Sequence, residues 1–516
     1  MRSKTERRKD GKTESRKVGR TLLSVLPSFR LSVPSAGVAL LALSWATPAL
    51  HGQIATSEYA ARRDSLAGRI GNGVLIAFGG RTPVSDFGPF YQLPAFRYLT
   101  GYEFADAALV MVVRGGRGTS TLYVTRSTPR RALYYGEEPD SAAIARQLGL
   151  ASRPAGDLAA VADSLAAAGL PVYGLRDVED ADFATADSLT RGGQFLRALA
   201  ARHPNVAVQD ASPTLDLLRA RKSDAELALI RKAAAISVAG HIELMNRIEP
   251  GMHEYDLQAI IEYTFRRGGA ERPAYGSIIG AGPNGTQLHY MKDRRELKPG
   301  EVVVIDAATE YDGYAADVTR TIPVSGSYTP EQRALYQVVR DGQAAAERNS
   351  KPGLSIQSAQ DSSLDVRARG LAALGLIESP TATFDPPWPA DCERSPRACE
   401  QVSLFAIHGI SHGLGLAVHD PLQAYYGDRT FKKGDAFTIE PGVYITPKLL
   451  DILPDTPRNH AFRDKVRAAV ERYKDTGVRI EGDYVITENG LEWISRAPRE
   501  LDEIEALLRK RTRPVP

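Results

Sequence analysis

The pattern of hydrophobic and polar positions divides most of the chain into two α/β regions. Between residues 56 and 216, apolar runs such as GVLIAFGG and AALVMVVRGG alternate with Ala-rich stretches of helical pattern such as DLAAVADSLAAAGL. This alternation predicts an α/β domain. The region contains few histidines or paired acids, which indicates that the chemistry of the protein lies further along the chain.

A long helical pattern marks the start of the second region. Ser223 and Glu226 form a capping box ahead of an apolar stripe, and Pro250-Gly251 ends the pattern. We therefore place the domain boundary near residues 216–222 and expect the second domain to cover 220–516.

The first 52 residues have the features of an export leader. Ten basic residues and only three acids lie within the first thirty positions, and an apolar run of eleven residues follows from Ala36 to Ala46. Such a run has the length of a signal-peptide core and is short for a bilayer span. We expect cleavage near residues 49–53 and an exported, periplasmic or secreted protein without a stable membrane span. The alternative is a retained leader that anchors the protein.

Charge does not predict a nucleic-acid partner. The formal charge is +3 and the pI is about 8.6, but the basic leader accounts for the excess. Without the leader the chain is mildly acidic, so we expect no binding to nucleic acid.

The two cysteines, Cys392 and Cys399, lie in a Pro-rich segment at 378–401 that has the composition of an inserted surface loop. Their spacing is wrong for a CxxC zinc or redox site. In an exported protein we expect a disulfide that closes a short loop, and two free thiols are the alternative.

Three of the nine histidines lie within the thirteen residues HGISHGLGLAVHD, from His408 to Asp420. His408 and His412 would share one face of a helix, as in a zinc-binding helix. However, a zincin helix needs Glu directly after the first His, and Gly409 stands there. Three glycines within seven residues also disfavour a helix, by about 1 kcal/mol each relative to Ala. The segment therefore predicts a Gly-rich loop or distorted strand.

Two acids are brought together by a predicted hairpin. In EVVVIDAATEYDGYAADVTRTIPVSG, the dipeptide Asp312-Gly313 is a strong turn signal between two strand-like runs. Counting outward from this turn places Asp306 opposite Thr319, and Asp306 and Asp317 then lie on one face as diagonal neighbours. The diagonal is ~7–8 Å between backbones, which allows both carboxylates to reach shared ions.

Two further acids, Glu440 in DAFTIEPGVYI and Glu481 in GVRIEGDYVIT, also lie in strand-like contexts. A solvated strand face would explain each acid alone. With Asp306, Asp317 and His412, these two acids make a set of four carboxylates and one imidazole. Carboxylates that lie close to one another resist ionising together. Two divalent cations would remove that repulsion and could support hydrolysis. Oxygen-rich ligands favour Mn²⁺, with Co²⁺ or Zn²⁺ as alternatives.

These motifs, in this order, resemble those of the pita-bread metallopeptidases, and specifically their aminopeptidase P and prolidase branch. AYGSIIGAGPNGTQLHY (274–290) is similar to a substrate-contacting segment of that branch, and FYQLPAFRYLTGYEFADAALVMVV (90–113) to its N-terminal domain. The resemblance covers roughly residues 56–500. It implies an α/β (α+β) protein with a non-catalytic, creatinase-like α/β domain at 56–216 and a pita-bread catalytic domain at 220–516.

The resemblance also implies roles for individual residues. The metal ligands would be Asp306, Asp317, His412, Glu440 and Glu481, with Asp317 and Glu481 bridging two ions. Glu440 would also be the catalytic base. The residues that line the substrate pocket would be His289, His408 and His419, and those that orient the ligands would be Arg479 and Tyr275. For His408, a histidine held by neighbouring backbone is the alternative.

The implied activity is that of an exported Xaa-Pro aminopeptidase, which hydrolyses the bond between an N-terminal residue and a penultimate proline. Its partners would be peptides with a proline in the second position. A prolidase, which cuts only Xaa-Pro dipeptides, is the first alternative, and a basic residue aimed into the pocket would favour it. A non-catalytic peptide-binding relative is the second alternative. Methionine aminopeptidase is disfavoured by the long N-terminal domain. Formation of a homo-oligomer is left open.

The sequence departs from the usual family pattern at several positions. Pro421-Leu422 follows His419-Asp420 where Val-Gly is usual, and Gly413 replaces an aromatic residue after the metal-binding histidine. We expect Gly413 to open space near the metals. The insertions at 378–401 and 447–475 could cover the site or form an oligomer contact.

Overall fold

The computed structural model describes residues 54–83, 88–176, 190–421 and 429–510. The predicted leader therefore lies outside the described residues. Residues 50–516 form one compact unit, and both predicted α/β regions belong to it. Across the described ranges, no helix combines the length and the apolar character that a membrane crossing would require.

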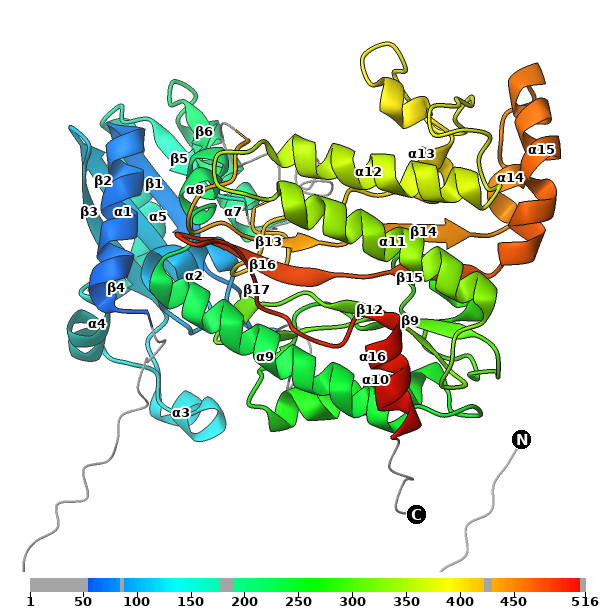
Figure 1. The fold of residues 1–516 in the computed structure, drawn as a ribbon. Coiled ribbons are helices and arrows are strands. Elements are labelled where there is room, and N and C mark those ends of the chain that lie inside the picture. Colours follow the sequence, from blue (N-terminus) through cyan, green and yellow to red (C-terminus); the bar gives the residue numbers. More distant parts are fainter. Residues whose placement is uncertain (1–53, 84–87, 177–189, 422–428, 511–516) are drawn as a thin grey trace, which may run out of the picture. The chain divides into compact units, whose positions relative to one another are not determined.

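The first domain is built on a mixed six-stranded sheet with the order β4-β3-β2-β1-β5-β6 (Figure 1). Strands β1, β2 and β3 are antiparallel neighbours, whereas β4, β5 and β6 pair in parallel. The strands are β1 (Gly73–Phe78), β2 (Ala108–Arg114), β3 (Arg117–Val124), β4 (Ala151–Pro154), β5 (Val172–Gly174) and β6 (Val208–Asp210). The helical segments are α1 (Thr56–Ile70), α2 (Pro94–Thr100), α3 (Pro129–Tyr135), α4 (Ser141–Leu148), η1 (Ala155–Asp157), α5 (Leu158–Ala167), α7 (Arg191–Arg202) and α8 (Ser212–Arg219).

Helices cover both faces of this sheet, which explains the continuous apolar run of β1. Leu75 packs in a cluster with Leu66 of α1, whereas Val74 packs in a second cluster with Ala162 of α5 and Leu199 of α7. All six residues of β1 are buried. A strand with two covered faces needs apolar side chains at successive positions, so the predicted α/β domain is confirmed.

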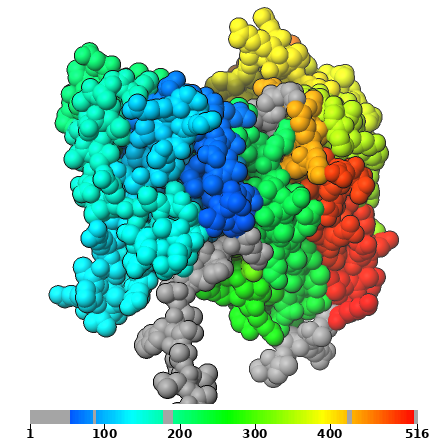
Figure 2. Space-filling model, turned by 90° about the vertical axis from the view of Figure 1, so that its left-hand side faces the viewer, coloured from blue at the N-terminus to red at the C-terminus, as the bar shows by residue number. Residues whose placement is uncertain are grey.

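The long helix predicted at the start of the second region is α9 (Asp224–Arg247). Its capping box forms as predicted: the side chain of Ser223 accepts a hydrogen bond from the backbone N–H of Glu226, whose carboxylate accepts one from the Ser223 N–H. Ser223 also donates a 2.7 Å hydrogen bond to Glu58 of α1, and Arg62 of α1 lies 3.3 Å from Glu226. Figure 2 shows α1, in dark blue, beside the green segment of the second domain.

The remaining strands form small sheets with the orders β11-β10-β7, β12-β9-β8, β13-β16-β17 and β14-β15. They are β7 (Arg272–Pro273), β8 (Ile278–Ala281), β9 (Val302–Asp306), β10 (Thr309–Tyr311), β11 (Tyr314–Ala315), β12 (Thr319–Pro323), β13 (Ala436–Ile439), β14 (Gly442–Ile445), β15 (Thr476–Arg479), β16 (Gly482–Thr487) and β17 (Gly490–Trp493). The other helical segments are α10 (Glu254–Arg267), η2 (Gly282–Thr286), α11 (Pro330–Asn349), α12 (Ile356–Ala373), η3 (Pro396–Cys399), α13 (Val402–Phe405), α14 (Lys448–Asp451), α15 (Pro457–Tyr473) and α16 (Leu501–Arg509).

The hairpin around Asp312-Gly313 has the predicted register. Asp306 pairs with Thr319, and Tyr311 pairs with Tyr314. The turn residues Asp312 and Gly313 have positive φ angles of 49° and 75°, as a tight two-residue hairpin turn requires.

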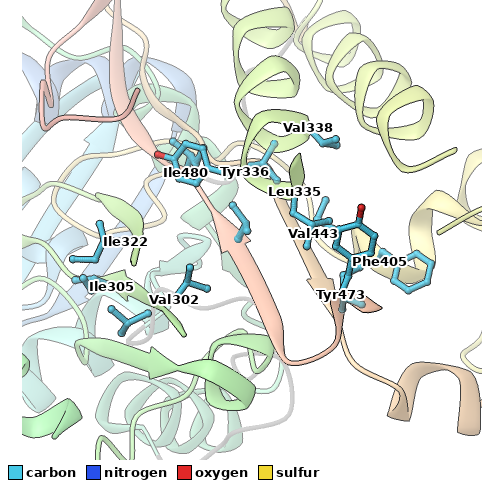
Figure 3. Packing of buried hydrophobic residues seen from close by; sticks show 14 of the residues in the cluster. Val302, Ile305, Ile322, Leu335, Tyr336, Val338, Phe405, Val443, Tyr473 and Ile480 are labelled. Atoms are coloured by element: carbon cyan, nitrogen blue, oxygen red, sulfur yellow. The ribbon is translucent and has the colours of Figure 1, made fainter. Parts of the chain in front are cut away.

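Strand periodicity separates the core from a polar side of the second domain. Ile305 of β9, Val443 of β14 and Ile480 after β15 belong to one buried apolar cluster together with Leu335 and Tyr336 of α11 (Figure 3). Since successive side chains of a strand point to opposite faces, the residues next to these apolar ones turn away from α11. Those next residues are Asp306, Tyr444, Arg479 and Glu481.

The two predicted insertions pack against each other. Asp385 accepts a 2.6 Å hydrogen bond from Thr456, and its backbone carbonyl accepts one from Asn459 of α15. Within the first insertion the structure joins Cys392 and Cys399 in a disulfide, with 5.7 Å between their Cα atoms. The Pro-rich segment is therefore an ordered loop fixed to α15 and closed by its own crosslink.

Candidate active site and metal centre

Three of these turned-away residues, Asp306, Arg479 and Glu481, line a cavity of about 520 Å³. Every residue to which the sequence assigned a metal, catalytic or orienting role lines it. These residues are Tyr275, His289, Asp306, Asp317, His408, His412, His419, Glu440, Arg479 and Glu481. The sequence thus predicted the polar part of the wall. It did not predict the apolar part, which is formed by Ile278, Leu288, Met291 and Val418.

The histidine-rich segment is an irregular loop, as predicted, and β13 holds it in place. Gly413 forms an isolated bridge with Phe437. The N–H of Thr438 donates to the carbonyl of His412, and the N–H of His412 donates to the Thr438 hydroxyl. The loop therefore behaves locally as a distorted extra strand beside β13, and this pairing fixes where His412 enters the cavity.

His412 faces two carboxylates. Its Nε2 atom lies 3.5 Å from Oδ2 of Asp317 and 3.5 Å from Oε1 of Glu440. One ligand atom from each of Asp317, His412 and Glu481 lies within 4.8 Å of the others. The Nδ1 atom of His412 is 3.1 Å from the carbonyl of Gly413. A proton on Nδ1 satisfies that carbonyl and leaves the Nε2 lone pair directed at the carboxylates, as metal-binding histidines require.

Asp306 completes the acidic cluster and is held from two sides. The hydroxyl of Tyr275 lies 2.6 Å from Oδ1 of Asp306 and 2.5 Å from Oδ1 of Asp317. Arg479 donates from Nη2 to Oδ2 of Asp306. The two predicted orienting residues therefore contact the carboxylates that they were expected to orient.

The cluster has more negative charge than the surrounding protein can balance. Burial, with neighbouring carboxylates second, raises the pKa of Asp317 and Glu481 well above the usual range and raises the pKa of Glu440 to about 8. Oε2 of Glu481 accepts a hydrogen bond from Thr319. Its Oε1 is buried and has no hydrogen-bond partner among the described residues.

An orphaned buried carboxylate oxygen beside an imidazole lone pair fits a bound cation. Distances of 3.5 Å between His412 and its two carboxylate neighbours are also the separations expected of atoms that share an ion at ~2.0–2.2 Å. The oxygen-rich donor set suits divalent cations. The residues present therefore fit the metals that the sequence predicted.

The remaining histidines surround this cluster. Nδ1 of His408 lies 2.7 Å from the carbonyl of Gly409, and Nε2 lies 2.8 Å from the hydroxyl of Tyr444. Burial and Arg479 lower the pKa of His408 to about 3, so its imidazole is neutral. Both nitrogens have protein partners, which agrees with the alternative of a histidine held by its neighbours. His419 packs edge-on against His412, with ring centroids 4.2 Å apart.

Sequence reasoning missed three residues that support the cluster. The Tyr444 hydroxyl joins His408 to Arg479, which donates to it at 2.7 Å. Thr319 donates to Glu481, and Asp483 accepts the N–H of Asp317 at 3.0 Å. The predicted register already placed Thr319 opposite Asp306, whereas a tyrosine within a short apolar strand gave no such signal.

Neither Gly413 nor the two insertions form part of the cavity wall. Gly413 is absent from the residues that line the cavity, and its carbonyl and N–H hold the loop behind His412. No residue of the segments 378–401 or 447–475, both of which are described throughout, lines the cavity. In a single chain these insertions do not cover the site.

The comparisons with known proteins agree with this geometry. Residues 228–488 match the family described as "Metallopeptidase family M24", and residues 59–172 match "Aminopeptidase P, N-terminal domain". The chain is 30% identical over 471 residues to the Xaa-Pro aminopeptidase of Escherichia coli strain K12, covering 88% of this chain and 98% of that protein.

Solved structures give the same result for the fold. The proline aminopeptidase P II of Yersinia pestis superimposes with a TM-score of 0.72 at 30% identity, covering 88% of this chain and all of that one. The zinc-substituted aminopeptidase P of E. coli in complex with product gives a TM-score of 0.71 at 28% identity, covering 89% of this chain and all of that one. The predicted two-part α/β fold is thereby confirmed. The chain belongs to metallopeptidase family M24, in its aminopeptidase P branch, and is a metal-dependent exopeptidase.

Proposed function

We propose that this protein is an exported Xaa-Pro aminopeptidase that uses two divalent metal ions, with Mn²⁺ as the favoured ion. The observation that carries the proposal is the convergence of four carboxylates and His412 on one cavity wall. The matched relatives, which are themselves Xaa-Pro aminopeptidases or aminopeptidases P, support the choice of substrate.

Of the four carboxylates in the proposed ligand set, Asp306 alone is paired with an arginine among the described residues. Asp306, Asp317, His412, Glu440 and Glu481 would hold the ions. Two bound divalent ions would polarise the scissile carbonyl and lower the pKa of a water molecule. All other steps fall to side chains of the chain itself.

Glu440 is placed to take the proton of the attacking water. Its Oε1 lies 3.5 Å from Nε2 of His412 and its Oε2 lies 3.7 Å from Nδ1 of His408, so one oxygen faces the ligand cluster and the other faces the pocket wall. The proline nitrogen must gain a proton as it leaves, and protonated Glu440, which lines the cavity, would be the acid that supplies it. His289 and His419, which line the same cavity, would hold the substrate carbonyl.

The charge of the cavity favours an aminopeptidase over a dipeptidase. A prolidase must bind the free carboxylate of its product-side proline, which calls for a cation in the pocket. Arg479 is the one Lys or Arg among the described residues that line the cavity, and it is engaged by Asp306 and the Tyr444 hydroxyl. A negative cavity in which the described residues offer no unengaged cation suits the ammonium end of a peptide and a chain that continues beyond proline.

A pair of substrates tests this proposal. The protein without residues 1–52, loaded with Mn²⁺, would be given an Xaa-Pro-Xaa tripeptide and an Xaa-Pro dipeptide in parallel. Release of only the first residue of the tripeptide is the expected result. Cleavage of the dipeptide alone would make the protein a prolidase. If neither peptide were cut by a protein with confirmed metal content, a peptide-binding role would replace the catalytic one.

Export needs a separate measurement, because the basic and apolar leader supports it only through its sequence pattern. The Cys392–Cys399 disulfide is also typical of an oxidising compartment. Cell fractionation of the full chain and of a chain lacking residues 1–52 should place only the full chain outside the cytoplasm. Equal distribution of both forms would contradict export.

A further inference from the structure

Two cations are buried where the first domain meets the second. Arg219, the last residue of α8, is 2% exposed, and Lys222, just before α9, is 6% exposed. Both lie between the two family-matched segments, 59–172 and 228–488, and outside the cavity wall. Burial of a cation is unfavourable unless it is paired and hydrogen-bonded, so their partners indicate what they do.

Both cations act on one residue of the histidine-rich loop. Nε of Arg219 lies 2.9 Å from Oδ1 of Asp420, which is 3% exposed. Nζ of Lys222 donates to the backbone carbonyls of Asp420, at 2.5 Å, and of Arg219, at 2.6 Å. The carboxylate and the carbonyl of Asp420 are thus both held from the domain junction.

Asp420 in turn closes the loop that carries the cavity histidines. Its Oδ2 accepts the N–H of Leu416 at 2.7 Å, and its own N–H donates to the carbonyl of Gly413 at 2.8 Å. The hydrogen bond between the Asp420 N–H and the Gly413 carbonyl therefore closes the loop from Gly413 to Asp420 at its base. His412 directly precedes this closed loop, and His419 is the residue within it that directly precedes Asp420. The rings of the two histidines contact each other, 4.2 Å apart.

The loop approaches the cations too closely for any side chain at one position. A Cβ atom on Gly415 would lie 2.3 Å from Oδ2 of Asp420 and 2.9 Å from Cε of Lys222. Glycine is required there by the packing, since its φ angle is not in the left-handed region. The loop backbone at Gly415 thus lies close to the Lys222 side chain, in addition to the contacts that both cations make with Asp420.

We propose that Arg219 and Lys222 are positioning residues, which hold Asp420 and through it fix the His419 imidazole beside His412 at the cavity wall. The kinetic part of this proposal rests on the proposed aminopeptidase function, whereas its structural part does not. Residues of the junction between the domains would then control the geometry of a site to which they contribute no atom.

Hydrogen exchange tests the structural part without any reaction. Lys222→Met removes the ammonium group and keeps the length of the side chain. Lys433→Met is the matched control, because the side chain of Lys433 is 60% exposed and pairs with Glu488 on the surface. We expect exchange in peptides covering 408–421 to become about tenfold faster in Lys222→Met, and to be unchanged in Lys433→Met. Unchanged exchange in both variants would overturn the proposal.

A double-mutant cycle with His419→Ala tests the kinetic part. Loss of the Lys222 contact with Asp420 should lower kcat for an Xaa-Pro tripeptide at least about tenfold, with KM within about threefold and with unchanged metal content. In the His419→Ala background, Lys222→Met should lower kcat less than about twofold further, because the group that it positions is gone. Equal fold losses in both backgrounds would show a general structural effect and overturn the proposal.

Two further variants keep the test decisive if Lys222→Met does not fold. Gly415→Ala pushes a methyl group into the same contact and leaves every charge in place. The pair Arg219→Gln with Asp420→Asn removes the cation and the carboxylate together, so that neither is left buried alone. Both should reproduce the faster exchange in 408–421. If the wild-type protein cuts no Xaa-Pro peptide, the proposed function fails, and the exchange result alone then decides the positioning role.

Discussion

Nε2 of His412 lies 3.5 Å from Oδ2 of Asp317, and the two groups face each other without a close hydrogen bond. A hydrogen bond between an imidazole and a carboxylate is normally shorter, near 2.7–2.9 Å. This separation, repeated between His412 and Glu440, has the size of an edge between two ligands of one ion. The spacing of His412 from Asp317 and Glu440 therefore fits side chains that share a bound ion better than side chains that hydrogen-bond each other.

The first prediction concerns stability in the absence of metal. Burial and neighbouring carboxylates raise the pKa of Glu440 from 4.5 to about 8, so the folded protein binds this proton more tightly than the unfolded chain. Such a group favours the folded state fully below about pH 4.5, and this contribution is lost as pH rises to about 8. The metal-free protein should therefore melt at a lower temperature at pH 8.5 than at pH 6.

Bound metal should remove this dependence, because the ions replace the protons in the cluster and stabilise the fold by binding it. Thermal unfolding would be followed at both pH values after chelation and again after addition of Mn²⁺. The same pH-dependent difference in melting temperature for both forms would contradict the prediction.

Glu440→Gln should remove nearly all turnover and leave the fold intact. The amide keeps the shape of the side chain but cannot take a proton, and loss of such a group lowers kcat by about 10²–10⁴-fold. The matched control is Glu492→Gln, since Glu492 pairs with Arg231 on the surface and should keep full activity. Steady-state kinetics with metal analysis would check both variants, and appreciable turnover by metal-loaded Glu440→Gln would refute the assigned base.

Tyr444→Phe should lower both the stability of the protein and its catalytic efficiency without removing a proposed metal ligand. The variant removes the hydroxyl that joins Arg479 to His408, and leaving these groups without their partner should lower the free energy of unfolding by about 1–3 kcal/mol. Because Arg479 also holds Asp306, we expect a lower kcat/KM as well. Urea unfolding and kinetics would be compared with those of Tyr263→Phe, because Tyr263 is 65% exposed. Identical behaviour of the two variants would show that the Tyr444 hydroxyl has no supporting role.

Replacing Cys392 and Cys399 by serine should lower the stability of the protein and leave its activity unchanged. The disulfide closes a short loop with a sequence separation of 7, and the loss of such a crosslink lowers the free energy of unfolding by about 2–3 kcal/mol in the chain-entropy picture. No residue of this insertion lines the cavity, so kcat and KM should stay unchanged. Altered kinetics in the serine variant would indicate that the insertion reaches the substrate after all.

Strand geometry, which is a local property, predicted the acids of the cavity wall, whereas the roles of its other polar residues were implied by the resemblance to the aminopeptidase P branch. Counting outward from Asp312-Gly313 placed Asp306 opposite Thr319, and this pairing is present. The alternation of polar and apolar positions around Glu481 predicted a strand face, but the structure places Glu481 between β15 and β16, where it still lines the cavity. Such arguments need only a turn and a period of two residues.

What the sequence could not predict depends on contacts between distant segments. Tyr444 lies in an apolar strand and is buried, as a core residue would be, so only the fold shows that its hydroxyl reaches Arg479 and His408. The packing of the two insertions on each other through Asp385 and Asn459 likewise joins residues that no local pattern connects. Lys222 stood at a helix start, where a cation is ordinarily solvated.

The position of Lys222 and Arg219 also bears on how this protein can be recombined with its relatives. A chimaera cut at the apparent boundary, between α8 and α9, would give the loop of one parent the cations of the other. The contacts to Asp420 and Gly415 make Arg219 and Lys222 part of the catalytic module, although they precede it in the chain. An exchange of N-terminal domains should therefore be made ahead of α8.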